Sequence, residues 1–303
     1  MQLYSNACSI GYFCKLFGKS RQAFYEQKDE VNNTGLQDAL VLKLVGEIRV
    51  DLPRCGTSKL HTMLQPIFAQ HHIKMGRDGL YDLLGNCGFL IRQRKRKPYT
   101  TNSNHHYKKY PNLIKEMLLT QAGQLWVCDI TYIRKLNEFS YLSIITDAYS
   151  HKIVGYKLHP TLAAEGAIDA LIMANKDNKK TKNLIHHSDR GVQYCCHDYV
   201  QMIEHFSIQL SMTENGDPYE NAIAERVNGI LKSEFLLNQT FSSYEVAKQA
   251  VDDAVKKYNE IRLHDSCNRQ TPLTAHEQKG VLKKLWKPKV YKQKETSKQA
   301  ATV

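Results

Sequence analysis

The fold is decided by the stretch Leu125-Trp-Val-Cys-Asp-Ile-Thr-Tyr-Ile133, a mainly apolar run with one carboxylate, Asp129, inside it. A run of this length and composition is typical of a buried strand. A carboxylate inside such a strand is costly unless it meets a partner, and hard divalent cations bind oxygen ligands of this kind. Two more acids stand in comparable contexts: Asp189 closes Leu184-Ile-His-His-Ser-Asp189, and Glu225 lies within Asn221-Ala-Ile-Ala-Glu-Arg-Val227.

The three carboxylates predict a metal site for phosphoryl transfer. Groups of this kind can hold a pair of divalent ions about 3.5–4 Å apart, which activates a nucleophile and stabilises a leaving oxygen. The alternative is that the acids are unrelated, as a strand-end cap, a turn aspartate and a solvated helix glutamate. Their sequence contexts favour the metal site.

The context of Glu225 is the most informative, because the run from Tyr219 to Phe235 follows Pro218 and predicts a helix. Lys232 lies two turns after Glu225, roughly 10 Å along the helix axis, which is too far for a shared ion and suitable for binding a substrate phosphate. An ordinary solvated helix face is the alternative. On a helical wheel the apolar face carries Ile223, Val227, Ile230 and Leu231, and the opposite face carries Asn221, Glu225, Asn228, Gly229 and Lys232.

Four motifs occur in order along the chain and together resemble one family, the second-frame transposases of the insertion-sequence-three family. These proteins belong to the retroviral-integrase-like DDE superfamily, and the resemblance covers about residues 35–280. One departure is Glu220, where the family usually carries Asp, and this acid lies outside the triad. The motifs are Trp126-Val-Cys-Asp-Ile-Thr-Tyr-Ile133, His187-Ser-Asp-Arg-Gly-Val-Gln-Tyr194, Gly216-Asp-Pro-Tyr-Glu-Asn-Ala222 with Glu225 and Lys232, and Tyr258-Asn-Glu-Ile-Arg-Leu-His264 followed by Thr271-Pro272.

The resemblance implies an α/β fold, an RNase H-like mixed five-stranded sheet with flanking helices. It implies that Asp129, Asp189 and Glu225 are the catalytic triad and bind Mg²⁺ or Mn²⁺, as two ions. Lys232 would contact DNA, and Asn221 and Asn228 on the same helix face are further candidate DNA contacts. The implied partners are the terminal repeats of the element, target DNA, other copies of the chain on DNA, and a protein from an upstream reading frame.

The net charge of +12 is concentrated in two segments. Residues 91–110 contain seven Lys or Arg and no acid, and residues 279–303 contain eight Lys and one Glu. Basic segments beside a nearly neutral body favour contacts to a polyanion, which weaken as salt rises. A solvated linker and tail are the alternative. The candidate DNA contacts of the first segment are Arg92, Arg94, Lys95, Arg96 and Lys97.

The cysteines favour a reducing cytoplasm, and the resemblance implies a bacterial, DNA-associated one. Eight cysteines occur without a CxxC spacing, as expected for free thiols. The pairs His71-His72, His105-His106 and His186-His187 do not stand before a cysteine pair at zinc-finger spacing, so we expect no structural zinc. The chain starts without the features of a signal peptide and has no stretch of roughly 20 apolar residues, so we expect no membrane association.

The region before the catalytic motifs is predicted to be helical. Residues 9–17 and a second helix capped by Ser20 form either a helix-turn-helix or an ordinary helical hairpin. A further helix is expected over 36–50. A second hairpin, over 56–68 and 77–87, resembles the DNA-binding region of the family, with 77–84 as recognition helix and Lys59 and Arg77 as phosphate contacts.

We therefore predict a helical DNA-binding region over 1–91, a basic linker over 92–111, a catalytic core over 112–280 and a basic tail over 281–303. Gly216 and Pro218 predict a turn-rich loop over 211–219 that can move over the metal site. Within the core, strands are expected at 125–134, 139–146, 152–158, 183–188 and 208–210, and helices at 112–120, 162–175, 196–205, 219–235 and 244–261.

These features predict a DNA transposase that cleaves at element ends and joins strands by direct, metal-dependent phosphoryl transfer. A non-catalytic DNA-binding regulator is one alternative, and it predicts an eroded triad, whereas the triad is intact. A nuclease of RNase H type that does not join strands is the other. It shares the triad and does not explain the helical region and the basic linker.

Overall fold

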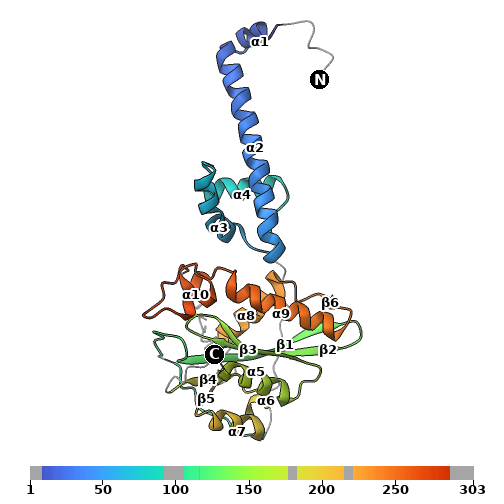
Figure 1. Cartoon of the computed structure of the whole chain (residues 1–303), viewed down its shortest axis with the longest axis vertical. Helices are drawn as coiled ribbons and strands as arrows, with labels where there is room; N and C mark the ends of the chain where they lie inside the picture. Colours follow the sequence, from blue (N-terminus) through green and yellow to red (C-terminus); the bar gives the residue numbers. More distant parts are fainter. Residues whose placement is uncertain (1–8, 92–105, 116, 177–182, 215–220, 287–303) are drawn as a thin grey trace, which may run out of the picture. The chain divides into compact units, whose positions relative to one another are not determined.

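The computed structural model describes residues 9–91, 106–115, 117–176, 183–214 and 221–286 (Figure 1). The chain separates into two compact units, within residues 1–97 and 98–303. The first unit is helical, and the second is built on a mixed sheet.

The first unit opens with α1 (Ile10–Leu16) and the long helix α2 (Arg21–Asp51). Ser20 caps α2 as predicted, because its Oγ accepts a hydrogen bond of 2.9 Å from the Ala23 amide. The prediction of a separate helix over 36–50 was wrong, since α2 runs through this range without a break. No proline occurs inside α2, and Gly35 alone costs only about 1 kcal/mol in a helix interior.

The second helical pair of this unit is α3 (Thr57–Gln70) and α4 (Arg77–Asn86), close to the predicted boundaries. Gly56 and Gly76 precede the two helices as their N-caps. The apolar residues of both helices recur at helical spacing and are buried, and two residues of α2 are buried as well. The buried apolar residues of α2, α3 and α4 are Val41, Val45, Leu60, Leu64, Phe68, Leu80 and Leu84.

The second unit contains a sheet with the strand order β3-β2-β1-β4-β5. β1 pairs antiparallel with β2 and parallel with β4, β2 pairs antiparallel with β3, and β4 pairs parallel with β5. This is the expected RNase H-like arrangement. A sixth, two-residue strand, which was not predicted, pairs with the far end of β1. The strands are β1 (Leu125–Lys135), β2 (Phe139–Asp147), β3 (Ile153–His159), β4 (Ile185–Ser188), β5 (Gln209–Met212) and β6 (Thr240–Phe241).

Helices cover both faces of this sheet (Figure 1). Successive side chains of β1 alternate between two cores: Cys128 belongs to the core under α5 and α7, and Ile133 to the core under α8 and α9. The helices on the first face are α5 (Ala164–Lys176), α6 (Val192–Cys195) and α7 (His197–His205). The helices on the second face are α8 (Ala222–Glu234), α9 (Tyr244–Glu260) and α10 (Pro272–His276).

The predicted helix over 112–120 was wrong, because the described residues of this range are not helical. Instead the chain lies along the edge strand β5. The Leu113 amide donates to Ser211 Oγ at 3.0 Å, and the Met212 amide donates to the Pro111 carbonyl at 3.3 Å. Such an edge offers unpaired backbone groups, and pairing with them competes with a short helix.

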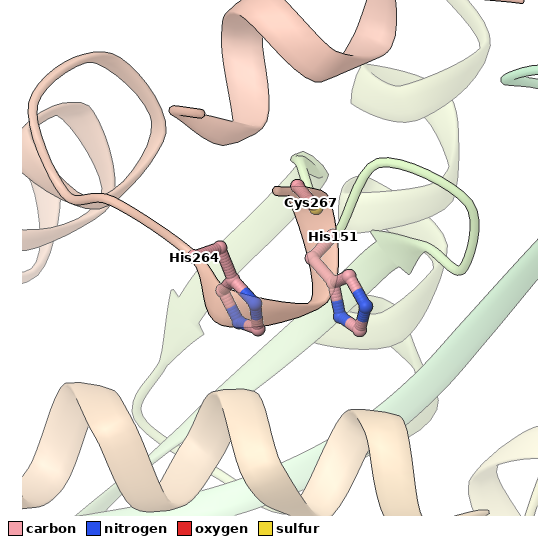
Figure 2. Close-up of side chains that lie close together, drawn as sticks. All are labelled: His151, His264 and Cys267. Atoms are coloured by element: carbon pink, nitrogen blue, oxygen red, sulfur yellow. The ribbon is translucent and has the colours of Figure 1, made fainter. Parts of the chain in front are cut away.

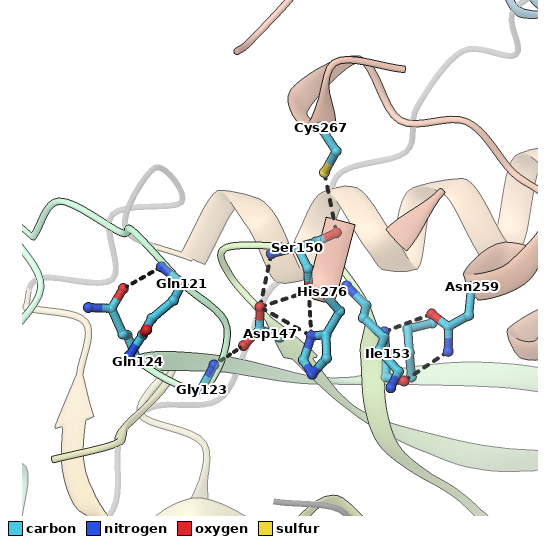
Figure 3. A network of polar contacts seen from close by, with 10 residues as sticks. Gln121, Gly123, Gln124, Asp147, Ser150, Ile153, Asn259, Cys267 and His276 are labelled. Atoms are coloured by element: carbon cyan, nitrogen blue, oxygen red, sulfur yellow. Dashed lines mark hydrogen bonds and ion pairs between the residues drawn. The ribbon is translucent and has the colours of Figure 1, made fainter. Parts of the chain in front are cut away.

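A polar network fixes the end of β2 (Figure 3). The fully buried Asp147 accepts hydrogen bonds from the Gly123 amide at 2.7 Å and from the amide and hydroxyl of Ser150 at 2.9 and 2.8 Å. His276 Nδ1 lies 2.9 Å from Ser150 Oγ and 3.8 Å from Asp147 Oδ1. The network therefore ties α10 to the turn after β2.

Gly155 of β3 allows α5 to pack directly on the sheet. A Cβ at this position would lie 2.1 Å from the Ala170 carbonyl oxygen and 2.8 Å from the Ala174 Cβ. At Gly229 of α8, a Cβ would meet nothing within 4 Å.

We expect Gly155→Ala to destabilise the second unit by at least about 1–3 kcal/mol, because the clash is with backbone and the core must shift. Gly229→Ala is the matched control and should stabilise by up to about 1 kcal/mol through helix propensity. Denaturant unfolding of both variants measures the difference. Equal stabilities would contradict this packing.

Candidate active site

Asp129 lies in the middle of β1 on the side that faces α8. Its Oδ2 accepts a hydrogen bond of 2.7 Å from Asn228 Nδ2, and its Oδ1 accepts one of 2.8 Å from the Ile130 amide. Both oxygens are therefore oriented by the protein. The side chain is half-buried.

Asp189 follows directly after β4, the parallel neighbour of β1. Val127 and His187 are register partners, so Asp129 and Asp189 each stand two residues beyond a paired position. The Asp189 carboxylate accepts a hydrogen bond of 3.0 Å from the Gly191 amide, which turns the chain into α6. Parallel pairing thus brings the two aspartates to the same place at the sheet.

Glu225 lies in the first turn of α8 and is exposed. Its negative charge and that of Asp189 both act on Asp129. The pKa of the Asp129 carboxyl is raised to about 7, by burial first and then by Asp189, and also by Glu225, while the hydrogen bonds from Asn228 and Ile130 oppose the rise. The three predicted carboxylates therefore lie close enough to interact electrostatically. Their oxygen atoms do not all lie within 4.8 Å of one another.

The donor set fits a hard divalent cation. All three groups offer oxygen atoms, which Mg²⁺ and Mn²⁺ prefer, and no thiol or imidazole competes among them. The pKa of Asp129 is raised by burial first and then by the neighbouring negative charges, and a bound cation would offset both effects by favouring the ionised carboxylate.

Lys232 of α8 also faces this site. It is half-buried, and burial lowers the pKa of its ammonium group while the negative charge of Asp129 raises it. The helical wheel had placed Lys232 and Glu225 on one face, and both groups interact electrostatically with the Asp129 carboxylate. A phosphate contact by Lys232 stays a prediction.

Asn221 and Asn228 anchor α8 to β1. The Asn221 Nδ2 donates to the Cys128 carbonyl at 2.9 Å, and Asn228 donates to Asp129. Each side chain is only 6% exposed. The sequence predicted both as DNA contacts, but their amides are buried against the protein. Their observed role is to position the helix that carries Glu225 beside the strand that carries Asp129.

Two histidines behind the aspartates were missed as site residues. His186 Nε2 lies 2.8 Å from Cys128 Sγ and 2.7 Å from the Tyr199 hydroxyl, and burial lowers the pKa of His186 to about 3. His187 Nδ1 lies 2.9 Å from Ser211 Oγ of β5. These two rings connect β4 to both neighbouring strands. Polar residues inside a buried run were the available sequence signal.

The other predicted DNA contacts belong to the first unit or lie outside the described residues. Lys59 is half-buried on α3. Arg77 begins α4, and its Nη2 lies 2.8 Å from the carboxylate of Asp78 in an exposed pair. The basic residues Arg92, Arg94, Lys95, Arg96 and Lys97, and much of the loop over 211–219, are outside the described ranges.

Among the helices of the described ranges, none combines the length and apolar character that a bilayer crossing requires.

The gathered carboxylates predict how substitutions shift the pKa of Asp129 in the metal-free protein. Asp189→Asn should lower this pKa because it removes a like charge, and Glu225→Gln should lower it less. Asn228→Ala should raise it, because the hydrogen bond favours the ionised form. Carbon-detected NMR titration measures the value directly. An unchanged pKa in Asp189→Asn would show that the aspartates do not interact.

The raised pKa of Asp129 also predicts how the stability of the protein changes with pH. An acid whose pKa is higher in the folded state binds more protons when folded, so the metal-free protein should lose stability as pH rises from 3.8 toward 7. Asp129→Asn should reduce this loss. Thermal unfolding across the pH range, with the metal removed, gives the measurement.

Comparison with known proteins identifies the family. Two Integrase core domain models match residues 120–218 and 206–272. The chain is 33% identical over 270 residues to the insertion element IS600 uncharacterized 31 kDa protein of Shigella sonnei, covering 87% of this chain and 97% of that protein. It is 33% identical to the transposase InsF for insertion sequence IS3A of Escherichia coli, covering 55% of this chain and 60% of InsF.

Among solved structures, the chain is similar to the HTLV-2 integrase catalytic core domain, which was solved in complex with magnesium. The sequences are 17% identical, the TM-score is 0.42, and the match covers 52% of this chain and 98% of that one. The sequence relatives carry the assignment, because one of them is matched over nearly its whole length. The chain therefore belongs to the integrase-core proteins of insertion sequences, as a DDE transposase of the IS3 type.

Proposed function

We propose that this transposase cleaves DNA at the ends of its insertion sequence and joins them to target DNA by direct phosphoryl transfer. The observation that best supports this proposal is that three carboxylates, from β1, the end of β4 and α8, interact electrostatically. Asp129, Asp189 and Glu225 are the proposed catalytic residues. The terminal repeats and target DNA are the proposed substrates.

The proposed cofactor is Mg²⁺ or Mn²⁺, as two ions held by Asp129, Asp189 and Glu225. Bound there, such ions lower the pKa of a coordinated water or hydroxyl and stabilise charge on the leaving oxygen. The chain itself keeps the ligands in place: Asn228 holds the Asp129 carboxylate, and the Gly191 amide holds that of Asp189. Lys232 offers a positive charge to a DNA phosphate beside them. No covalent protein–DNA intermediate is needed.

We further propose that the parts of the chain divide the work. The helical region over 1–91 and the linker over 92–111 recognise the element ends, with Lys59, Arg77 and the linker basic residues as contacts. The core over 112–280 performs the chemistry, and the tail over 281–303 adds charge. Oligomers on DNA, an upstream-frame partner and a DNA-associated cytoplasmic location complete the proposal.

Substitution of any triad member should abolish both reactions. Asp129→Asn, Asp189→Asn and Glu225→Gln keep the shape of the side chain and remove its metal-binding charge, so cleavage and strand transfer should fall by at least about 100-fold while DNA binding is retained. Asp198→Asn, at an exposed acid on α7, is the control. Assays use terminal-repeat DNA with Mg²⁺. Full strand transfer by one triad variant would remove that residue from the triad.

Pre-cleaved ends separate a transposase from the alternative nuclease. If the protein cuts DNA and never joins a supplied 3′ end, the nuclease without strand transfer is the correct function.

Lys232→Ala should weaken binding of the element end and reduce the salt dependence of binding by about one phosphate contact. Lys248→Ala is the control, because Lys248 pairs with Asp252 on α9 at 3.0 Å. Titrations of the same DNA at several salt concentrations give the slope of log K against log salt. An unchanged slope would assign Lys232 to a solvated helix face.

A further inference from the structure

A second cluster of metal-ligating side chains lies apart from the triad, between the turn after β2 and the segment after α9 (Figure 2). It consists of His151, His264 and Cys267, and all three are buried. Each offers one ligand atom, and these atoms lie within 4.8 Å of one another. The imidazoles of His151 and His264 are stacked, with ring centroids 4.3 Å apart and an interplanar angle of 12°.

Hydrogen bonding does not explain why a histidine is buried at position 151. Its Nδ1 is buried and finds no hydrogen-bond partner among the residues described, and buried polar atoms are rarely left in this state. Its backbone is left-handed, with φ of 59°, a conformation that is uncommon outside glycine. The protein therefore holds this ring nitrogen buried in an uncommon backbone conformation, without a hydrogen-bond partner among the residues described.

The donor chemistry favours a borderline cation. Two imidazoles and a thiolate are typical ligands of Zn²⁺, whereas Mg²⁺ prefers the oxygen atoms of the triad. Ligand atoms on a tetrahedral Zn²⁺ lie about 3.3–3.8 Å apart, given bond lengths of about 2.0–2.3 Å. The widest allowed separation here would have to contract by about 1 Å. One of the two stacked imidazoles would also have to turn on binding, because the lone pairs of nearly parallel rings lie in parallel planes and do not converge on one ion.

The protonation states and charges are compatible with a cation. Burial, followed by the charges of Lys284 and Arg262, lowers the pKa of His151 to about 4, so the ring is neutral and can donate a lone pair at pH 7. Burial, followed by Asp147, raises the pKa of Cys267 to about 12, so the thiol must release its proton on binding. The thiolate and the nearby Asp147 then balance the two charges of the ion.

Of the two positive charges that act on His151, that of Arg262 is compensated by an acid. The buried Arg262 forms two hydrogen bonds of 2.8 Å to the Glu234 carboxylate.

We propose that His151, His264 and Cys267 form a structural Zn²⁺ site, with solvent as the fourth ligand. On binding, the Cys267 proton passes to the buffer, and the thiol hydrogen bond to the Ser150 carbonyl, now 3.3 Å, is replaced by the Zn–S bond. The sequence had predicted no structural zinc, because none of its adjacent histidine pairs stands before a cysteine pair at zinc-finger spacing. Their proximity arises only in the folded sheet.

The ion would fasten the C-terminal segment to the sheet. The turn that holds His264 and Cys267 also holds residues 283–286: the Asn268 amide donates to the Lys283 carbonyl at 3.0 Å, and the Leu285 amide donates to the Asp265 carbonyl at 2.8 Å. Trp286 Nε1 donates to Ser266 Oγ at 2.9 Å. Zn²⁺ would therefore stabilise the path of the chain into its lysine-rich end.

The test uses the full chain, stripped of metal and kept reduced. Zn²⁺ is titrated against a chromophoric chelator, and Co²⁺ serves as an optical probe because a thiolate ligand gives it a charge-transfer band in the near ultraviolet. We expect one equivalent of thiolate-bound metal, release of one proton from Cys267 and a higher melting temperature. Cys267→Ser, His264→Gln and His151→Asn should each weaken Zn²⁺ binding by at least about 100-fold and remove the cobalt band.

Controls separate this site from other ligands. Cys87→Ser and His197→Gln alter exposed residues, and Asp129→Asn alters the triad; all three should keep the cobalt band. Cys267→Val keeps a buried apolar side chain, so it replaces Cys267→Ser if that variant misfolds. The proposal is overturned if the wild type shows no thiolate–cobalt band at millimolar Co²⁺, or if Zn²⁺ affinity survives in the Cys267 variant that folds.

Discussion

The parallel pairing of β1 with β4 is the constraint on which the site depends. It sets the carboxylates of Asp129 and Asp189 side by side, and two like charges at a half-buried site repel. The sheet can hold them there because backbone hydrogen bonds fix both strands: β1 is paired with β2 along most of its length, and β4 is paired with β1 on one side and with β5 on the other. The sheet thus keeps the two carboxylates close despite their repulsion, and a bound cation would reduce that repulsion.

The third carboxylate depends on how α8 is held. Asn221 and Asn228 bond the front of the helix to β1, and Glu234 at its last turn is bonded by the buried Arg262. Between these attachments lie Glu225 and Lys232. A helix fixed at both ends can present an acid and a cation to one substrate with little rearrangement, which is the requirement for catalysis by positioning.

A polar network at the end of β2 also supports the strand that carries Asp129. Asp147 lies opposite Trp126 in the β1–β2 register, so its buried network with Ser150, Gly123 and His276 also fixes the beginning of the strand that carries Asp129. The cluster of His151, His264 and Cys267 adjoins this network through the bond from Cys267 to Ser150. The C-terminal segment and the strand that carries Asp129 are therefore held by the same polar network.

The sequence by itself determined the three long strands and the apolar face of α8, because side-chain periodicity is a local property. It also supplied the three carboxylates that we propose as the triad, through their motifs and the family resemblance. It did not determine that α2 is continuous, that residues 112–120 pass beside β5, or that Asn221 and Asn228 bond to β1. Periodicity predicts which residues lie on the same face of a helix or strand, but not which other element packs against that face. Only the tertiary structure decided these points, and only it brought His151 to His264 and Cys267, since contacts between distant segments arise when the sheet and its helices pack.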